Sequence, residues 1–332
     1  MKQNLAQVIC NAALAWLYLI LAVLYLALAG GCQPAATPPQ GSEPANERPA
    51  LQPVALAPGE KLQVVATTSI VADVVRNVGG DLIELTMLMP LGTDPHAFEP
   101  TPQDAAAVAD AHVVFINGAG LELFLEPLLQ SIGGREKIVA VSQGIELRRL
   151  GDEHGHGDVD PHVWFDPLNV MVWTGNIEQA LSALDPHHAS AYAANSAAYQ
   201  ARLRELDAWI QEQVAQVPAT QRRLLTDHTV FGYFAARYGF EQVGTLFPGL
   251  STLAQPSARE LAALAEAIRA YEVKALFVGT TVNPSLARQV AEDTGRRLVF
   301  LYTGSLSGPD GPAADYLSLM RYDVAAIVEA LK

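Results

Sequence analysis

The stretch from His154 to Pro167 reads His-Gly-His-Gly-Asp-Val-Asp-Pro-His-Val-Trp-Phe-Asp-Pro and sets three histidines among three aspartates. Neutral imidazole is the commonest metal-ligating side chain in proteins, and it binds zinc through one ring nitrogen. Within the stretch, Pro161 has a fixed φ and keeps Asp160 extended, so that His162 is presented on a stiff turn. The segment therefore predicts a metal-ligating turn.

Two further histidines are candidates for the same site. The tripeptide Asp-Pro-His also occurs at 94–96, where it ends at His96, and His228 follows in the context Thr-Asp-His-Thr-Val-Phe. His96 comes after a predicted strand at 83–89, and His228 comes after one at 224–226. Ligands of open α/β sheets lie beyond the carboxyl ends of the strands. We therefore expect His96, His162 and His228 to converge on one metal ion.

From residue 62 onward, short apolar runs alternate with helical patterns, which is typical of βα units and parallel sheets. Strands are expected at 62–67, 83–89, 113–117 and 138–141, and in a second series at 224–226, 241–245, 275–278 and 298–302. Helices are expected at 70–78, 103–109, 122–131, 231–238, 258–271, 284–294 and 314–331.

One long helix is expected between the two series. Asp185-Pro186 is a good helix start, and the next proline is Pro218. Apolar residues from Tyr192 to Val214 recur mostly three, four or seven apart. A helix of about thirty residues is ~45 Å long, which is too long for one small lobe.

These patterns predict an α/β fold with two lobes, each with a parallel-rich sheet flanked by helices. One long spanning helix joins the lobes, and the metal site lies in the cleft between them. The expected segments are a signal peptide at 1–31, a flexible linker at 32–59, an N-terminal lobe at 60–184, the linking helix at 185–217 and a C-terminal lobe at 218–332.

Bulk composition excludes some functions. Half of the 332 residues are hydrophobic and 17% are charged, which is typical of a globular protein. The formal net charge of −14 repels polyanions, so we expect no nucleic acid partner.

The N-terminus is expected to direct export. Lys2 precedes an uncharged apolar segment at 12–29, and Gly30-Gly31-Cys32 follows. The small residues before Cys32 resemble a bacterial lipobox, which implies cleavage before Cys32 and a lipid anchor on it. An uncleaved membrane anchor is the alternative. The Pro- and Ala-rich stretch at 33–58 is expected to be a flexible stalk. The protein is thus expected on the outer face of the cell membrane or in the periplasm.

Several motifs, taken together, resemble a known family. They are Gly-Thr-Asp-Pro-His-Ala-Phe-Glu-Pro-Thr-Pro-Gln-Asp at 92–104, Asn-Gly-Ala-Gly-Leu-Glu at 117–122, Asp-Pro-His-Val-Trp-Phe-Asp-Pro at 160–167 and the segment 228–239, with looser matches at 277–284 and 316–322. In this order they resemble the metal-binding solute-binding lipoproteins of bacterial zinc and manganese ABC importers, the TroA-like superfamily. The resemblance implies two α/β lobes joined by one long helix, with the metal between them.

The resemblance also implies a ligand set. His96 and His162 take the first two ligand positions, and His228 takes the third, which is histidine in zinc-type members. The fourth ligand is usually a carboxylate of the C-terminal lobe, but this chain has Gly304 there and Gly279 at the end of the preceding strand motif. Water, or a carboxylate from the nearby loop, then has to complete the site. The loop candidates are Asp310 and Asp315.

Three imidazoles with at most one carboxylate favour Zn²⁺, whereas Mn²⁺ prefers more oxygen donors and is less expected. Copper also binds imidazole, so affinity alone does not exclude it. Asp94, Asp160 and Asp227 each lie within two residues of a ligand and are expected to orient the imidazoles. His154 and His156 occupy the place of the histidine-rich loop of zinc-type members, which implies auxiliary metal capture; a solvated turn is the alternative.

The expected function is capture of Zn²⁺ and its delivery to an ABC permease driven by an ATPase, by a monomer that catalyses nothing. Capture is expected to weaken below roughly pH 6, because ligand histidines must be neutral. A zinc hydrolase or hydratase with three histidines and an open fourth position is the alternative. A surface adhesin, suggested by the anchor and stalk, is a third possibility.

Overall fold

The structure is a computed structural model that describes residues 50–149 and 159–332. The expected signal peptide at 1–31, the lipid-anchor residue Cys32, and His154 and His156 lie outside the described residues.

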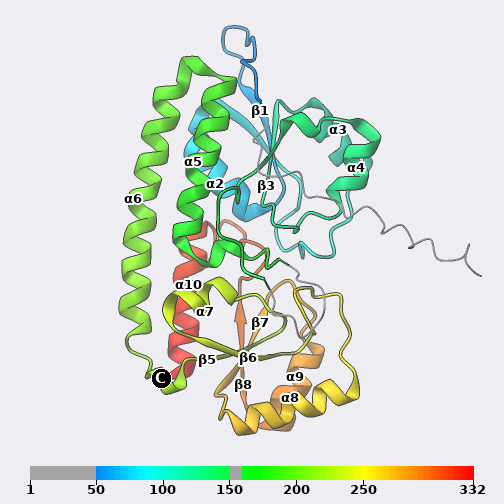
Figure 1. The fold of residues 1–332 in the computed structure, drawn as a ribbon, viewed down its shortest axis with the longest axis vertical. Coiled ribbons are helices and arrows are strands. Elements are labelled where there is room, and N and C mark those ends of the chain that lie inside the picture. The colour runs from blue at the N-terminus through cyan, green and yellow to red at the C-terminus, as the bar shows by residue number, and fades with distance from the viewer. Residues whose placement is uncertain (1–49, 150–158) are drawn as a thin grey trace, which may run out of the picture. The chain divides into compact units, whose positions relative to one another are not determined.

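The N-terminal lobe is built on a parallel sheet with the strand order β2-β1-β3-β4 (Figure 1). Its strands are β1 (Leu62–Ala66), β2 (Ile83–Met87), β3 (Val113–Ile116) and β4 (Ile138–Ala140). Helices α2 (Ser69–Gly79), α3 (Pro102–Asp110) and α4 (Leu125–Ile132) follow β1, β2 and β3 in the chain. All of these elements confirm the predicted series to within a few residues.

The C-terminal lobe repeats this strand order as β6-β5-β7-β8, again all parallel. Its strands are β5 (Arg223–Thr226), β6 (Glu241–Thr245), β7 (Ala275–Gly279) and β8 (Arg297–Leu301). Its helices are α7 (Gly232–Tyr238), α8 (Ala258–Ala270), α9 (Ser285–Thr294) and α10 (Tyr316–Leu331). Because parallel strands end at a common edge, each lobe presents one row of loops that can carry ligands.

The long helix is α6 (Ala189–Val214), whose 26 residues extend about 39 Å. It packs against α2 of the N-terminal lobe and against α10 of the C-terminal lobe, as Figure 1 shows. The apolar stripe predicted for it is buried at Tyr192, Tyr199, Leu203, Leu206, Ile210 and Val214. The predicted start was wrong by a few residues, because Pro186–His188 forms a separate 3₁₀ turn. There the Asp185 carboxylate accepts hydrogen bonds from the His188 ring and the Tyr192 hydroxyl.

Helix α5 (Pro167–Leu184) has no counterpart among the sequence predictions. It packs against both α6 and α2, so it buries more than one side and lacks a single apolar stripe. Its start did carry a signal: Asp166 accepts a hydrogen bond from the Leu168 N–H, and Pro167 occupies the first turn. The helix matters for function because it follows the turn that carries His162.

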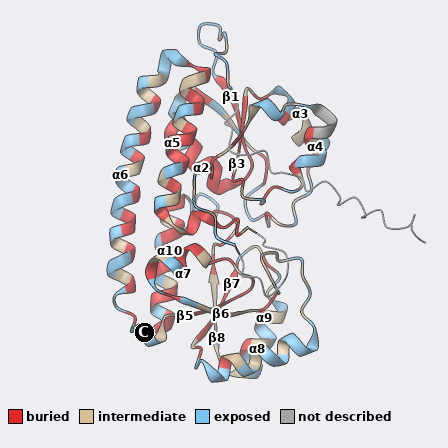
Figure 2. Ribbon diagram, viewed as in Figure 1, coloured by how far each residue is buried: buried red, intermediate tan, exposed pale blue. Residues whose placement is uncertain are grey.

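One large apolar core extends through both lobes and the helices that join them, and the C-terminal lobe holds a second, smaller cluster. Figure 2 shows buried positions on the strands, and on α6 the buried residues recur every three or four residues along one face. The expected stalk joins this core at its end: Leu51, Val54 and Leu56 pack against it, and the Val54 N–H donates to the Leu184 carbonyl at 2.8 Å. The prediction of a flexible stalk as far as residue 58 was therefore wrong for residues 51–56. In the described ranges, no helix combines the length and apolarity needed to cross a membrane.

Candidate metal centre

The turn that carries His162 is fixed by its own aspartate. Asp160 Oδ1 accepts a hydrogen bond from the His162 backbone N–H at 3.0 Å and lies 2.8 Å from His162 Nδ1. Because a carboxylate only accepts, Nδ1 carries the proton and Nε2 has a free lone pair. Tyr233 of the C-terminal lobe donates to the Asp160 carbonyl at 2.9 Å, and the Tyr316 hydroxyl donates to the Trp164 carbonyl at 2.7 Å. The C-terminal lobe therefore helps to hold this turn of the N-terminal lobe.

His228 is held by the same device in the C-terminal lobe. It lies two residues after β5, and Asp227 Oδ1 is 2.7 Å from both its backbone nitrogen and its Nδ1. The second oxygen of Asp227 accepts the Gly279 N–H at 2.6 Å. Burial raises the pKa of Asp227, but the His228 ring and these hydrogen bonds outweigh it and bring the pKa below its ordinary value. The ionised aspartate thus keeps the Nε2 lone pair of His228 free.

His96 is held differently. Asp94 Oδ1 accepts the His96 backbone N–H at 3.0 Å, while Asp94 Oδ2 accepts the hydroxyl of Thr252 from the C-terminal lobe at 2.5 Å. In the described part of the chain, no carboxylate binds the His96 ring at Nδ1. The expectation that Asp94 orients this imidazole was therefore wrong: it fixes the loop and not the ring. His96 is also more exposed than the other two histidines.

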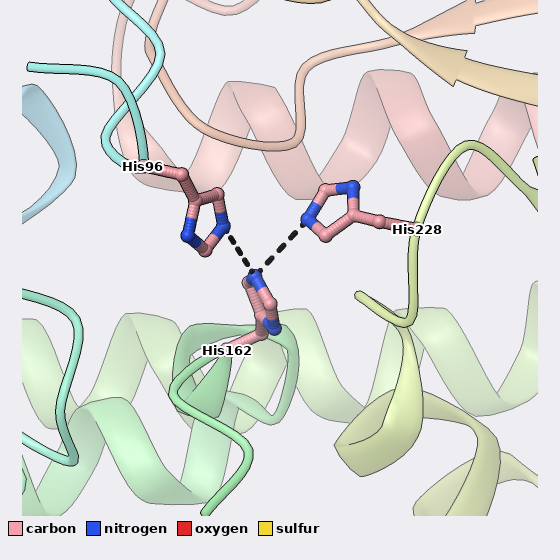
Figure 3. Close-up of side chains that lie close together, drawn as sticks. All are labelled: His96, His162 and His228. Carbon is pink, nitrogen blue, oxygen red and sulfur yellow. Dashed lines mark hydrogen bonds between the residues drawn. The ribbon is translucent and has the colours of Figure 1, made fainter. Parts of the chain in front are cut away.

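The three imidazoles converge, as predicted (Figure 3). Nε2 of His162 lies 3.2 Å from Nε2 of His96 and 3.2 Å from Nε2 of His228, and all three rings offer a nitrogen within 4.8 Å of the others. Three nitrogens that bind zinc at ~2.0–2.1 Å in a tetrahedron are about 3.3 Å apart. The spacing therefore fits a common ion.

The charge state of the rings supports the same conclusion. A hydrogen bond between Nε2 of His162 and Nε2 of His228 needs a proton on one of these two atoms. Both rings already carry a proton at Nδ1, which faces an aspartate, so the ring with the additional proton would be an imidazolium. Burial is the main cause that lowers the pKa of His162, and burial with the two neighbouring histidines lowers the pKa of His96 to about 2. The lone pairs that Asp160 and Asp227 leave free on Nε2 of His162 and His228 therefore point at the place that the His96 ring also faces, where a cation is the favourable occupant.

The pocket at this point has donors of both lobes but little room. It is lined by Asp94, Pro95, His96, His162, Trp164, His228, Thr252, Thr281, Thr303 and Gly304. About 10 Å³ is open to the centre of a water-sized sphere, which is the room that one water molecule needs. The pocket therefore suits an atomic ion with a water-sized ligand and excludes an organic substrate.

The loop carboxylates named from the sequence do not reach this pocket. Asp315 is the N-cap of α10, where its Oδ1 accepts the Ser318 N–H at 2.7 Å, and Asp310 is exposed. Neither lines the pocket, so the expectation that one of them completes the site was wrong. At position 304, a β-carbon would lie 2.8 Å from Pro95 Cδ, because the His96 loop packs directly on Gly304. At position 279, a β-carbon would clash with the Thr303 hydroxyl.

The remaining described histidines stay apart from the cluster. His112 lies one residue before β3, and its Nδ1 accepts the N–H of Gln63 in β1 at 2.9 Å. His187 and His188 belong to the exposed turn before α6. Sequence reasoning missed Thr281 and Thr303, because threonines in loops carry no distinctive signal. It also assigned no role to Glu122, although Glu122 is the last residue of the 117–122 motif.

Two parallel α/β lobes, a helix packed against both, and three convergent imidazoles in a pocket lined by both lobes define a two-lobed solute-binding protein. Residues 64–330 match the family model described as ZnuA, zinc-uptake complex component A periplasmic. The chain belongs to this family, and the resemblance to the TroA-like superfamily is confirmed.

Individual relatives agree with this assignment. The chain is 34% identical to the manganese-binding lipoprotein MntA of Halalkalibacterium halodurans over 274 residues, which cover 82% of this chain and 89% of that protein. It is 30% identical to the manganese ABC transporter substrate-binding lipoprotein PsaA of Streptococcus mitis over 282 residues, 83% of this chain and 91% of that one. The solved structure of the periplasmic zinc binding protein TroA from Treponema pallidum superposes with a TM-score of 0.76 at 28% identity, over 82% of this chain and 99% of that chain.

As a member of this family, the chain is the substrate-binding component of an ABC importer for metal ions, and it is not an enzyme. The zinc hydrolase or hydratase alternative has no support among the relatives. The names of these relatives include both manganese and zinc. Membership of the family therefore shows that the cargo is a metal ion, and it does not show which metal.

Proposed function

We propose that this protein captures Zn²⁺ through Nε2 of His96, His162 and His228 and hands it to the permease. The observation that carries the proposal is the 3.2 Å distance of His162 Nε2 from Nε2 of both His96 and His228. Aspartates that hold the Nδ1 protons of two rings are the outer-shell partners typical of zinc-ligating histidines.

The donor set supports zinc over manganese. Among the described residues, the only metal-binding group of three or more ligand side chains consists of these histidines, and it includes no carboxylate. Zinc accepts three imidazoles and one further ligand in a tetrahedron, whereas manganese favours oxygen-rich sites. Titration calorimetry of the metal-free protein should give one zinc per chain, and a tenfold excess of Mn²⁺ should not displace it. Absence of zinc binding, or ready displacement by Mn²⁺, contradicts the assignment.

Water is proposed as the fourth ligand. The hydroxyls of Thr281 and Thr303 line the pocket next to Gly304, and they offer hydrogen bonds to a metal-bound water in the room that remains there. Cobalt can replace zinc and reports coordination through its visible spectrum. If water completes the site, thiocyanate or azide should exchange with it and change the spectrum of the cobalt protein. A spectrum that is unchanged at saturating anion would indicate a ligand supplied by the chain.

The wider setting is proposed from the relatives and from the N-terminal sequence. The relatives include proteins named as lipoproteins, and here Cys32 would carry the lipid that anchors a monomer outside the cell, with residues 60–184 and 218–332 as lobes and Ala189–Val214 as the helix that links them. The partners are then an ABC permease and its ATPase. Expression in a bacterial host should yield a membrane-bound, lipid-modified protein, and Cys32→Ala should abolish the lipid modification.

A further inference from the structure

The carboxyl group of Glu122 is buried at the carboxyl ends of two strands of the N-terminal lobe. Glu122 as a whole residue is only 8% exposed. Its Oε1 accepts the Asn117 N–H at 2.6 Å and the Thr67 hydroxyl at 2.8 Å, while its Oε2 accepts the Gly118 N–H at 3.0 Å. Thr67 follows β1 and Asn117 follows β3, so one carboxyl joins the ends of two neighbouring strands.

The loop that Glu122 holds is not stable by itself. Gly118, Ala119 and Gly120 have φ values of +79°, +52° and +81°, and alanine has no intrinsic preference for this region. At position 118, a β-carbon would also lie 2.7 Å from the Ser142 hydroxyl. Such a conformation persists only where the surroundings impose it. The two backbone hydrogen bonds to Glu122 supply this restraint.

The restrained loop contacts the metal-ligating turn through Asn117. The Asn117 side-chain amide donates to the Pro161 carbonyl at 3.0 Å and to the Gly118 carbonyl at 2.7 Å. Its Oδ1 is buried without a hydrogen-bond partner, which is unfavourable for a polar atom. The amide is therefore oriented for its two donor bonds, and Pro161 directly precedes His162.

We propose that Glu122 is a positioning residue for metal capture: through Asn117 it fixes the turn that presents His162. The inference rests on the proposed function, since it concerns the affinity of the same site. Glu122 touches neither the imidazoles nor the ion, and it acts by narrowing the positions that the Pro161–His162 backbone can adopt. Preorganisation of this kind raises affinity, because the ordering is complete before the ion arrives.

The charge of Glu122 gives a signature that a purely structural residue would lack. Burial raises its pKa to about 7, against hydrogen bonds from Thr67, Asn117 and Gly118 that favour the ionised form. These facing groups are all uncharged. The ionised carboxylate accepts both backbone N–H groups strongly, whereas the neutral carboxyl accepts them more weakly. The restraint on His162 should therefore loosen as the pH falls through about 7.

The test compares zinc affinities, by competition with a chromophoric chelator, for the full chain and four variants. Asn117→Ala, Glu122→Ala and Glu122→Gln should each weaken zinc binding, the first two by about 10–100-fold, as for other outer-shell partners. The matched control is Asn176→Ala. Asn176 is another buried asparagine of the same lobe, and its amide donates to the carbonyls of Val141 and Gln143. Its replacement should lower the stability of the metal-free protein but leave zinc affinity within twofold.

Two further readouts decide between positioning and general destabilisation. The double variant Asn117→Ala with Glu122→Gln should lose no more affinity than the weaker-binding single variant, because both residues act in one chain of contacts. The ratio of wild-type to Glu122→Gln affinity should rise as the pH increases through about 7. Additive losses, a pH-independent ratio, or an equal loss in Asn176→Ala would overturn the inference. Wild-type protein that binds no zinc overturns the proposed function as well, whereas zinc binding unaffected by Asn117→Ala overturns this inference alone.

Discussion

In the N-terminal lobe the central strand β1 is followed directly by Thr67, whose hydroxyl donates to Glu122. In the C-terminal lobe the corresponding strand β5 ends at Thr226, whose hydroxyl donates to the carbonyl of His228, a metal-ligand candidate two residues on. The strand orders β2-β1-β3-β4 and β6-β5-β7-β8 correspond position by position, so β1 and β5 are topological equivalents.

The same strand end therefore serves a supporting role in one lobe and carries a ligand in the other. The N-terminal lobe instead presents His96 on the long loop after β2 and His162 on the turn before α5. The comparison shows that similar architecture does not imply similar ligand placement. The C-terminal lobe offers one rigid imidazole, while the N-terminal lobe offers one rigid imidazole and one whose ring is less constrained.

Loss of a rigid ligand should have the largest effect. We expect His162→Ala and His228→Ala to lower zinc affinity by more than about a hundredfold, beyond the 10–100-fold typical of outer-shell partners. His96→Ala should lower it by at least about tenfold. His187→Ala, in the exposed turn before α6, is the control and should change nothing. Calorimetry of the four variants checks this order, and equal effects across all four would break the comparison.

Substitution of the aspartates tests whether the two lobes orient their imidazoles in the same way. Asp160→Asn and Asp227→Asn should each cost about 10–100-fold in zinc affinity, because each replaces the ionised acceptor of an Nδ1 proton by a neutral and weaker amide oxygen. Asp94→Asn should cost less, since Asp94 contacts only the backbone of His96 and Thr252. An Asp94→Asn effect as large as the other two would show that the His96 ring is oriented through Asp94 after all.

Zinc should also stabilise the fold, because the ligands come from both lobes. At a free zinc concentration of 100 Kd, binding adds about 2.7 kcal/mol to the free energy of unfolding. Thermal or urea unfolding with zinc and with a chelator measures this gain. The gain should vanish in His228→Ala at the same zinc concentration, while a retained gain would place zinc in one lobe only.

The pH dependence of the metal-free protein should differ between the wild type and His96→Gln. The pKa of His96 is about 2 in the folded protein and about 6.5 when unfolded, so acid protonates the unfolded state first. Stability is lost as the pH falls below about 6.5, by about 2 kcal/mol between pH 7 and pH 5. Because the pKa of His96 is lowered, protons should compete with the metal ion for this ring only below the pH of about 6 that is expected from free imidazole. Urea unfolding at both pH values should show a smaller loss in the variant.

The smallest effect is expected at the contact between the lobes beside the ion. Gly304→Ala places a methyl group 2.8 Å from Pro95, so the His96 loop must shift by a few tenths of an ångström. We expect zinc affinity to fall by a few-fold, less than for any ligand. Thr252→Val, which removes one hydrogen bond to Asp94 from the same loop, is the companion variant. Tighter zinc binding in Gly304→Ala would contradict this expectation, because it would mean that the displaced His96 loop binds the ion better.

Much of this protein is determined by its sequence alone. The alternation of apolar runs and helical patterns is local, so both sheets and the buried stripe of α6 from Tyr192 to Val214 could be predicted. The Asp-Pro-His tripeptides likewise place His96 and His162 on stiff turns, because proline restricts the neighbouring backbone. The same tripeptide at 185–187 ends at His187, which lies apart from the cluster, so the tripeptide alone does not identify a ligand.

Only the tertiary structure decided the rest. Helix α5 was missed because it is covered on more than one side, which removes the one-sided pattern that marks a surface helix. The distance between the Nε2 atoms, the contact of Pro95 with Gly304 and the path from Glu122 through Asn117 to Pro161 each join residues far apart in the chain. Sequence patterns report the covalent neighbourhood of a residue, whereas coordination geometry depends on packing across the whole fold.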